Sequence, residues 1–344
     1  MDETNQPQPH KHHEALPTLV LSRRCVAGLM TARDYFAAAE DAFRALATGR
    51  AAAPTPMHIP CEAGGFHAKG ARMDDAGRGY VAVKVNANFP GNPRTFNLPT
   101  IQGAVVLADA ANGAPLAIMD SVEITLRRTA AATALAATLL ARPNAETVAI
   151  CGCGDQARAQ LAALATEFRL KRVLVWDIDR SRATAFAEEM SAHLTCPVTC
   201  VDALRTATLR SDMIVTCTTS RTAFLDVGDV RPGTFVAAVG ADSHDKSEIA
   251  PDLMAKATVV VDVLEQCAVM GDLHHAINAG LMTTKDVSAA LGELVVGQRP
   301  GRADEEEITI FDSTGTAVQD VAAAVRIYDR ARTQRVGHVL SLDN

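Results

Sequence analysis

The chain has 344 residues, long enough for two domains, and its 48% hydrophobic and 21% charged content is typical of a globular protein. A formal net charge of −7, with only three Tyr and one Trp, argues against binding to nucleic acid or to an anionic membrane surface. No apolar run reaches the roughly 18 residues that a membrane-spanning helix needs.

Residues 1–17 are polar and lack the apolar stretch of a secretory signal, which predicts a disordered tail and a cytoplasmic protein. The eight cysteines lie mostly within apolar runs, and the Cys-x-x-x-Cys spacing that begins at Cys196 has no second pair of ligands beside it. We therefore expect reduced thiols and no metal site.

The first part of the chain predicts a helix followed by a sheet. Residues 32–48 carry apolar side chains at helical spacing. An extended pattern runs over residues 57–109, and its last strand can pair with residues 115–119 across a turn at Asn112 and Gly113. This arrangement indicates an antiparallel or mixed sheet rather than repeated βαβ units.

A long helix is predicted over residues 121–142, with Ser121 as its N-cap and Glu123 in its first turn. After it, short strands alternate with helical stretches, which is the pattern of a doubly wound parallel sheet. The predicted fold class is therefore α/β, with a Rossmann-type sheet. The strand signals lie near residues 147–151, 172–176, 197–201, 212–216, 234–239 and 258–262.

The C-terminal part predicts one more strand at residues 308–311 and an amphipathic helix over residues 317–332. Because the parallel sheet is already complete, we expect this helix to return to the first sheet. The expected organisation is a discontinuous α+β domain, residues 18–125 with 318–344, and a second domain built on the parallel sheet, residues 126–317.

The most informative segment, residues 147–159, runs from a β-branched strand through Gly152, Gly154 and Ala157 into an alanine-rich helix. This is the G-x-G-x-x-A form of the dinucleotide fingerprint in its strand–turn–helix context. Gly152 permits the tight turn, Gly154 lets the backbone approach a pyrophosphate, and Ala157 allows the helix to pack closely on the strand. The helix N-terminus then presents unpaired N–H groups to phosphates.

Asp177 ends the next strand, about twenty residues beyond the glycines, as the fingerprint requires. A carboxylate there accepts hydrogen bonds from both ribose hydroxyls and repels a 2′-phosphate, so NAD(H) is the predicted cofactor. Arg180 and Arg182 lie close enough in the sequence to leave NADP(H) open. The alternative is an ordinary βαβ turn in which the aspartate caps a helix.

Two cations are candidates for binding a substrate carboxylate. Lys84 lies in the middle of a half-buried strand, where a lysine is uncommon unless its amine meets an anion. Arg127 and Arg128 lie early in the long helix, and we expect one of them to face solvent and the other to face inward. A lysine and an arginine in one cleft suit a carboxylate, and a pair of interdomain salt bridges is the alternative.

Two loops follow strands of the parallel sheet, at the edge where ligands bind in such folds. Asp242 follows the fifth strand, where an apolar nicotinamide face would raise its pKa and suit it to acid–base catalysis. A helix cap is the alternative for this residue. Cys217, Thr218 and Thr219 follow the fourth strand, where hydroxyl groups can bond the nicotinamide ribose, and a simple turn is the alternative.

Seven stretches are specific when taken together, although each alone is weak. They are residues 83–85 (Val-Lys-Val), 89–93 (Phe-Pro-Gly-Asn-Pro), 98–103 (Leu-Pro-Thr-Ile-Gln-Gly), 128–131 (Arg-Thr-Ala-Ala), 152–157 (Gly-Cys-Gly-Asp-Gln-Ala), 239–242 (Val-Gly-Ala-Asp) and 312–320 (Asp-Ser-Thr-Gly-Thr-Ala-Val-Gln-Asp). Through them the chain resembles the ornithine cyclodeaminase/mu-crystallin family over nearly its whole length, from about residue 19 to residue 335.

The resemblance implies a nicotinamide-dependent homodimer that acts on amino acids, imino acids or cyclic ketimines. It also implies that Lys84 and Arg128 hold the substrate carboxylate and that Asp242 is the catalytic acid/base. We take Asp242 and Lys84 as the catalytic candidates. The candidate cofactor contacts are Gly152, Gly154, Asp155, Gln156, Ala157, Asp177, Arg182, Thr129, Cys217, Thr218, Thr219, Val239, Gly240, Ser313 and Gly315.

One region departs from the cyclodeaminase pattern. That pattern looks to need an arginine near Met57 and a glutamate near His67 to hold the distal amino group of ornithine, and neither is in place here. Glu62 would substitute only if its loop were rearranged. A buried ammonium without its charged partner loses several kcal/mol in recognition. We therefore favour a reductase, with Met57, His67 and Lys69 bordering the substrate pocket and Lys69 as an additional carboxylate contact.

The leading hypothesis is NAD(P)H-dependent reduction of a small imino acid or cyclic ketimine, of the Δ1-pyrroline-2-carboxylate type, to the L-amino acid. Lys84 and Arg128 would hold the carboxylate, while Asp242 would supply or relay the proton that the nitrogen gains. The alternatives are alanine dehydrogenase-like oxidative deamination, ornithine or lysine cyclodeamination, and a mu-crystallin-like protein that binds cofactor without turnover.

Overall fold

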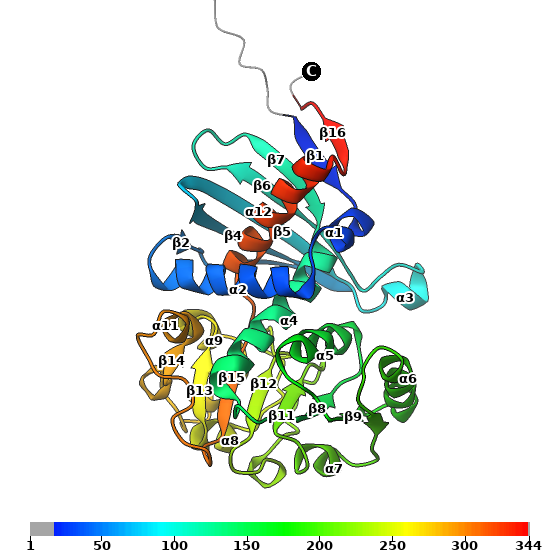
Figure 1. Ribbon diagram of the computed structural model, residues 1–344, viewed down its shortest axis with the longest axis vertical. Helices are drawn as coiled ribbons and strands as arrows, with labels where there is room; N and C mark the ends of the chain where they lie inside the picture. The colour runs from blue at the N-terminus through cyan, green and yellow to red at the C-terminus, as the bar shows by residue number, and fades with distance from the viewer. Residues whose placement is uncertain (1–16, 343–344) are drawn as a thin grey trace, which may run out of the picture.

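The computed structural model describes residues 17–342, so all but the last residue of the tail expected over residues 1–17 lies outside the described residues. Two sheets form separate layers, a mixed sheet in the upper half of Figure 1 and a parallel sheet in the lower half. Helix α4 (Ser121–Leu140) leads from the first layer to the second. No helix within residues 17–342 has the length and apolar character needed to cross a membrane.

The mixed sheet lies in the first layer. Its strands are β1 (Thr18–Leu21), β2 (Ala51–Ala52), β3 (Met57–Cys61), β4 (Gly64–Asp75), β5 (Arg78–Asn88), β6 (Ile101–Asp109), β7 (Pro115–Asp120) and β16 (His338–Leu340). They are ordered β16-β1-β7-β6-β5-β4-β2, with β3 paired to β4, and β1 is parallel to β7 while the other pairs are antiparallel. The predicted mixed sheet is confirmed, and β1 and β16 were not predicted.

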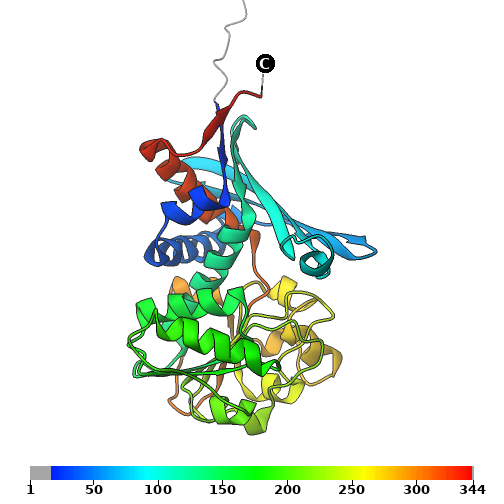
Figure 2. The ribbon, with the colours of Figure 1, turned by 90° about the vertical axis from the view of Figure 1, so that its right-hand side faces the viewer.

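Alternation along β4 and β5 sorts their side chains onto two faces. Lys69 and Lys84 lie directly opposite each other in the register of this strand pair, on the inner face that α4 and α12 (Ala317–Gln334) cover. Val83 and Val85 point to the outer face and are exposed. Figure 2 shows these strands, in blue and cyan, reaching sideways beyond the helices.

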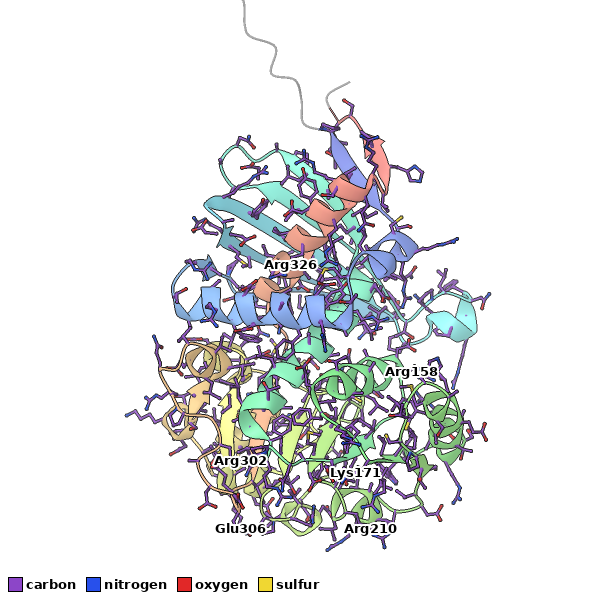
Figure 3. All side chains as sticks on the ribbon, in the orientation of Figure 1. Arg158, Lys171, Arg210, Arg302, Glu306 and Arg326 are labelled. Atoms are coloured by element: carbon purple, nitrogen blue, oxygen red, sulfur yellow. The ribbon has the colours of Figure 1, made fainter. Side chains whose placement is uncertain are left out.

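Helices cover the inner face of the mixed sheet. Besides α4 and α12 they include α1 (Arg23–Leu29) and α2 (Ala32–Ala47), and the short α3 (Asn92–Thr95) follows β5. As expected, α12 returns from the parallel sheet to pack on β4, β5 and α2. Arg326 of α12 forms an ion pair with Asp41 of α2 (Figure 3). The division of the chain into residues 18–125 with 318–344 and residues 126–317 stays a prediction.

The parallel sheet lies in the second layer. Its strands are β8 (Thr147–Cys151), β9 (Arg172–Trp176), β10 (Val198–Cys200), β11 (Met213–Thr216), β12 (Phe235–Ala238), β13 (Thr258–Val261), β14 (Ala289–Ala290) and β15 (Thr309–Asp312). The order is β10-β9-β8-β11-β12-β15-β13-β14 and every pair is parallel. From β8 the chain adds β9 and β10 on one side of the sheet, and it then adds β11 and β12 on the other side. This change of side between β8 and β11 places a crevice at the carboxyl ends of these two strands.

Helices flank the parallel sheet. They are α5 (Asp155–Glu167), α6 (Arg180–Ser191), α7 (Leu204–Thr208), α8 (Pro251–Lys256), α9 (Leu264–Cys267), α10 (Asp272–Asn278) and α11 (Leu291–Val295), with 3₁₀ turns η1 (Val227–Asp229) and η2 (Thr284–Asp286). Arg158 of α5 pairs with Glu189 of α6 at 2.5 Å (Figure 3). The Rossmann-type α/β arrangement agrees with the sequence prediction.

The predicted N-cap of α4 was wrong. Asp120 is the cap, because its Oδ1 accepts a hydrogen bond from the Glu123 N–H at 2.9 Å. Ser121 is instead fully buried, and its hydroxyl donates to Asn86 Oδ1 at 2.5 Å. The helix ends at Leu140 rather than 142, since the residue before a proline disfavours helical backbone and Pro143 follows.

Candidate active site

A cleft lies between the carboxyl ends of the parallel strands and the inner face of the mixed sheet. It consists of three cavities of about 540, 220 and 140 Å³. The first two share Gln156 and Thr218, and the second and third share Arg128 and Asp242, so the cavities adjoin in a row. A wider cavity of about 980 Å³ adjoins the third and is also lined by His67 and Asp242.

The glycine turn has the geometry that a dinucleotide needs. Gly152 has a φ of 95°, and a Cβ there would come within 2.8 Å of Thr218 Cγ2. Gly154 is the N-cap of α5 without a side-chain hydrogen bond, and a Cβ there would meet only Arg182, at 3.9 Å. The N–H groups of the first turn therefore face open space, which fits a pyrophosphate. Ala157 is fully buried and lines none of these four cavities, which fits close packing of α5 on the strand.

Asp177 follows β9 and lines the 540 Å³ cavity. Its two carboxylate oxygens accept hydrogen bonds from Cys153 N–H at 2.8 Å and from Asp179 N–H at 2.9 Å. The helix-cap alternative is wrong for this residue, because Asp179 caps α6. Arg182 lines the same cavity, whereas Arg180 pairs with an exposed aspartate on the surface.

The other candidate cofactor residues gather over the ends of β8, β11, β12 and β15. Gly315 has a φ of 79°, and a Cβ there would lie 2.6 Å from Arg128 Nη1, so only glycine fits beneath this guanidinium. Asp155 lines the 540 Å³ cavity. The candidate cofactor residues among those that line the 220 Å³ cavity are Thr129, Gln156, Cys217, Thr218, Thr219, Val239, Gly240, Ser313 and Gly315.

Lys84 and Arg128 converge in the third cavity, as predicted. Both are buried, and both contact Asp320 of α12, at 2.7 Å from Lys84 Nζ and 3.3 Å from Arg128 Nε. Salt bridges, which were the alternative, are thus also present. The single Asp320 carboxylate pairs with two cations, so the three side chains together carry a net positive charge. Burial lowers the pKa of Lys84 to about 7, although the Asp320 carboxylate acts in the opposite direction. Arg127 is the outward arginine and pairs with Glu123.

Lys69 is a third cation in the same cavity. Its Nζ donates to the carbonyl oxygens of Thr314 at 3.2 Å and Gly315 at 3.0 Å, which joins β4 to the loop after β15. Burial, and next the charge of Arg128, lowers the pKa of Lys69. Two buried cations and a partly buried one, Lys69, therefore line this cavity, which favours an anionic ligand.

Met57 lines the wider cavity together with His67 and Lys69, but it lies on the opposite face of the sheet from them. His67 lies on the inner face and stacks on His58 with ring centroids 4.4 Å apart, and burial and then His58 lower its pKa. Met57 pairs with Ala68, so strand alternation turns it to the outer face, where it is 55% exposed. Met57 lines only the wider cavity, and His58 occupies the inward position beside it.

Asp242 lies in the loop after β12 and lines three of the cavities, those of about 220, 140 and 980 Å³. The helix-cap alternative is wrong, because the next helix begins at Pro251. The expected rise in pKa beside a bound nicotinamide stays a prediction. In the single chain the side chain is 56% exposed, and although desolvation favours a higher pKa, Lys246, whose Nζ lies 2.6 Å away, together with Lys69 and His67 lowers it below the ordinary value. Asp242 is therefore an ionised carboxylate.

Sequence reasoning missed three charged residues of the site. Lys246 lines the second and third cavities, Asp320 joins the two carboxylate-binding cations, and Glu248 lies buried beneath the loops at the ends of β11 and β12. Asp320 belongs to one of the specific motifs, but nothing in the sequence indicates its partners. Within residues 17–342 no cluster of three His, Cys, Asp or Glu side chains has the arrangement of a metal site.

A model of the ornithine cyclodeaminase/mu-crystallin family matches residues 17–335. The chain belongs to this family. Among solved structures, an archaeal alanine dehydrogenase dimer with bound NAD is 35% identical to it, covers 95% of this chain and 99% of its own, and has a TM-score of 0.90. The predicted family and the Rossmann-type fold class are thereby confirmed.

Two further family structures carry names of C=N reductases. The Δ1-pyrroline-2-carboxylate reductase of Thermococcus litoralis, in complex with NADH and L-proline, is 33% identical, with 93% of this chain and 99% of its own covered and a TM-score of 0.89. The iminosuccinate reductase of Paracoccus denitrificans, in complex with NAD+, is 31% identical, with 95% and 100% covered and a TM-score of 0.86.

Proposed function

We propose that this family member uses NADH to reduce a small imino acid or cyclic ketimine, of the Δ1-pyrroline-2-carboxylate type, to the L-amino acid. The observation that carries the proposal is the row of cavities, which leads from the glycine turn past Asp242 to Lys84 and Arg128. The related imino-acid reductases support the reaction class, an NAD(P)-dependent oxidoreductase acting on C=N bonds.

Lys84 and Arg128 bind the substrate carboxylate. Together they carry two positive charges against the single charge of Asp320, so one substrate carboxylate completes the local charge balance. The arginine offers parallel donors and fixes the orientation of the carboxylate. Lys69, anchored on two carbonyl oxygens, adds to the positive potential.

Asp242 acts on the proton of the reacting nitrogen. Bound NADH supplies a hydride to the C=N carbon, and the nitrogen must carry or gain one proton for the charge to balance. The ionised Asp242 stabilises a protonated iminium, and it can pass a proton from the Lys246 ammonium to an unprotonated imine. Lys246 then regains its proton from solvent through the wider cavity that it lines.

The substitution Asp242→Asn tests this role. It removes the charge without changing the size of the side chain, so NADH binding persists while kcat falls by roughly 10²–10⁴-fold. The measurement is NADH oxidation at 340 nm with Δ1-pyrroline-2-carboxylate, alongside NADH titration by fluorescence. Asp245→Asn is the matched control in the same loop, where the carboxylate pairs with Arg221. Full turnover by D242N would eliminate the proposed acid/base role.

Alanine dehydrogenase activity is the second candidate, because the archaeal alanine dehydrogenase is 35% identical over nearly the whole chain. It uses the same carboxylate-binding cations and differs in needing ammonia or water. The screen therefore includes pyruvate with ammonia and pyruvate with methylamine. NADH oxidation that needs pyruvate and free ammonia, with none on the cyclic ketimine, favours this candidate over the first.

The active form is proposed to be a homodimer. The outer face of the mixed sheet presents large apolar side chains to solvent, and such a contiguous patch is typical of a subunit interface. The related archaeal alanine dehydrogenase is a dimer. The exposed apolar residues on this face are Met57, Ile59, Phe66, Val83, Val85 and Val106.

A further inference from the structure

Glu248 is a buried carboxylate with three donors. Its Oε1 accepts the Thr218 N–H at 2.6 Å, and its Oε2 accepts the Thr216 hydroxyl at 2.7 Å and the Gly240 N–H at 2.8 Å. Thr216 and Thr218 belong to the end of β11 and the loop after it, and Gly240 belongs to the loop after β12 that leads to Asp242. One side chain therefore joins the two loops that line the 220 Å³ cavity.

The backbone at Gly240 and the backbone at Glu248 both favour the contact between this carboxylate and the loop. A Cβ at Gly240 would lie 2.4 Å from Glu248 Oε1, so glycine is required for the carboxylate to reach the loop. The Glu248 N–H donates to Asp272 Oδ1 at 2.8 Å, and the Glu248 carbonyl accepts from Phe224 N–H at 3.0 Å. The backbone of Glu248 is thus fixed by Asp272 and Phe224, while its carboxylate binds the two loops.

We propose that Glu248 is a positioning residue, which fixes the Thr218 loop and the Asp242 loop relative to each other. This rests on the proposed role of Asp242. A carboxylate two residues beyond a tethered glycine has little freedom to move, and a displacement of about 1 Å at a reacting group can lower a rate by roughly 100-fold. Burial and then the Asp272 charge raise the pKa of Glu248 to about 7, while the hydrogen bonds from Thr218 and Thr216 act in the opposite direction.

The substitution Glu248→Gln is the sharpest test. Glutamine has one acceptor oxygen, so one of the two backbone N–H groups then faces an NH₂ group and its loop is released. We expect kcat with Δ1-pyrroline-2-carboxylate to fall by roughly 10- to 100-fold. The KM for the imino acid changes little, because Lys84 and Arg128 are held by Asp320 of α12 and not by Glu248. With 4-deuterated NADH the kinetic isotope effect on kcat rises, because hydride transfer becomes slower than product release.

Two further measurements separate positioning from a loss of stability. NADH titration by fluorescence shows weaker binding in E248Q but not in D242N, since only the former releases the Thr218 loop. In the double variant E248Q/D242N the rate falls little below that of D242N, because Glu248 acts through Asp242. Asp212→Asn is the matched control: this carboxylate accepts the N–H groups of Glu146 and Thr147, each at 3.0 Å, at the opposite end of the sheet. D212N lowers the melting temperature and leaves the kinetics unchanged.

The outcomes distinguish the two proposals. If E248Q keeps its kcat, isotope effect and NADH affinity and only melts earlier, the positioning role is wrong. If the losses of E248Q and D242N multiply in the double variant, Glu248 does not act through Asp242 and the proposal is also wrong. Full activity of D242N overturns the acid/base role instead. Should E248Q not fold, Glu248→Asp serves in its place, since the shorter carboxylate reaches only one of the two loops.

Discussion

Lys84 combines complete burial with a positive charge, and this combination makes the site sensitive to pH. Its pKa is lowered to about 7, first by burial and also by Arg128 and Lys69, while Asp320 opposes the shift. In the free protein the ammonium therefore loses its proton as the pH rises through about 7. Above that pH one of the two carboxylate-binding cations is neutral.

We accordingly expect kcat/KM for the imino acid to decline above a pH of about 7, because this parameter reports the free enzyme. In Lys84→Arg the cation stays charged at every accessible pH, so its profile is flatter on the alkaline side, whatever its absolute rate. The measurement is kcat/KM from pH 6 to about 9 for both proteins, with NADH affinity followed in parallel. An unchanged alkaline decline in K84R would assign it to another group, such as the imine nitrogen.

At the level of single residues, motifs and local pattern identified Lys84, Arg128 and Asp242 as functional candidates. They did not predict what surrounds these residues. The low pKa of Asp242 comes from Lys246, and the partner of the two cations comes from α12, more than 190 residues later in the chain than Arg128. The register of β3 on β4 turns Met57 to the outer face, which the sequence does not reveal, although Met57 still lines the wider cavity with His67 and Lys69.

Helix α4 illustrates how a tertiary contact decides a local feature. Serine and aspartate are both good N-caps, and the sequence offers Asp120 and Ser121 in succession. The Ser121 hydroxyl is taken by Asn86 of β5, which leaves the aspartate to accept the Glu123 N–H. The cap also matters for the site, because Arg128 lies two turns further along the same helix.

We expect Asp120→Ala to lower the free energy of unfolding by about 1 kcal/mol, since it removes an N-cap acceptor and leaves a helical N–H unpaired. The measurement is urea denaturation followed by circular dichroism, with an unchanged m-value. Asn is the matched control at this position, because it keeps a capping oxygen and restores most of the stability. A midpoint in D120A equal to that of the unmodified protein would show that the cap contributes nothing.

Whole elements were predicted better than their contacts. The strands β8, β9, β11, β12 and β13 follow from apolar, β-branched runs bounded by turn residues, because a strand buried on both faces leaves that pattern in the sequence. The two-residue strands β2 and β14 and the three-residue strand β16 are too short to show such a pattern, and the apolar run of β1 was not assigned as a strand. Their pairing depends on segments far away in the chain, which periodicity does not reveal.

At the scale of the whole molecule, the exposed outer face of the mixed sheet predicts the state of assembly. Val83 and Val85 of β5 stand beside Val106 of β6, and all three are exposed in the single chain. We expect the unmodified protein to be a dimer and Val85→Lys to be a monomer of unchanged fold, because a buried unpaired ammonium is strongly unfavourable. Size-exclusion chromatography with light scattering measures both.

Val339→Lys is the control for this test, because Val339 is equally apolar and exposed but belongs to β16 at the far edge of the sheet. It should leave the dimer intact. A dimer that persists in V85K at micromolar concentration, or an unmodified protein that is already monomeric, would contradict the proposed interface.

Asp320 belongs to α12, whereas its partners Lys84 and Arg128 are synthesised much earlier during translation. On a ribosome the glycine turn and all strands of the nucleotide layer emerge before this carboxylate does. A nascent chain halted before residue 317 therefore lacks both this counter-ion and the helix that packs on β4 and β5. Completion of the substrate pocket is accordingly a late event of biosynthesis.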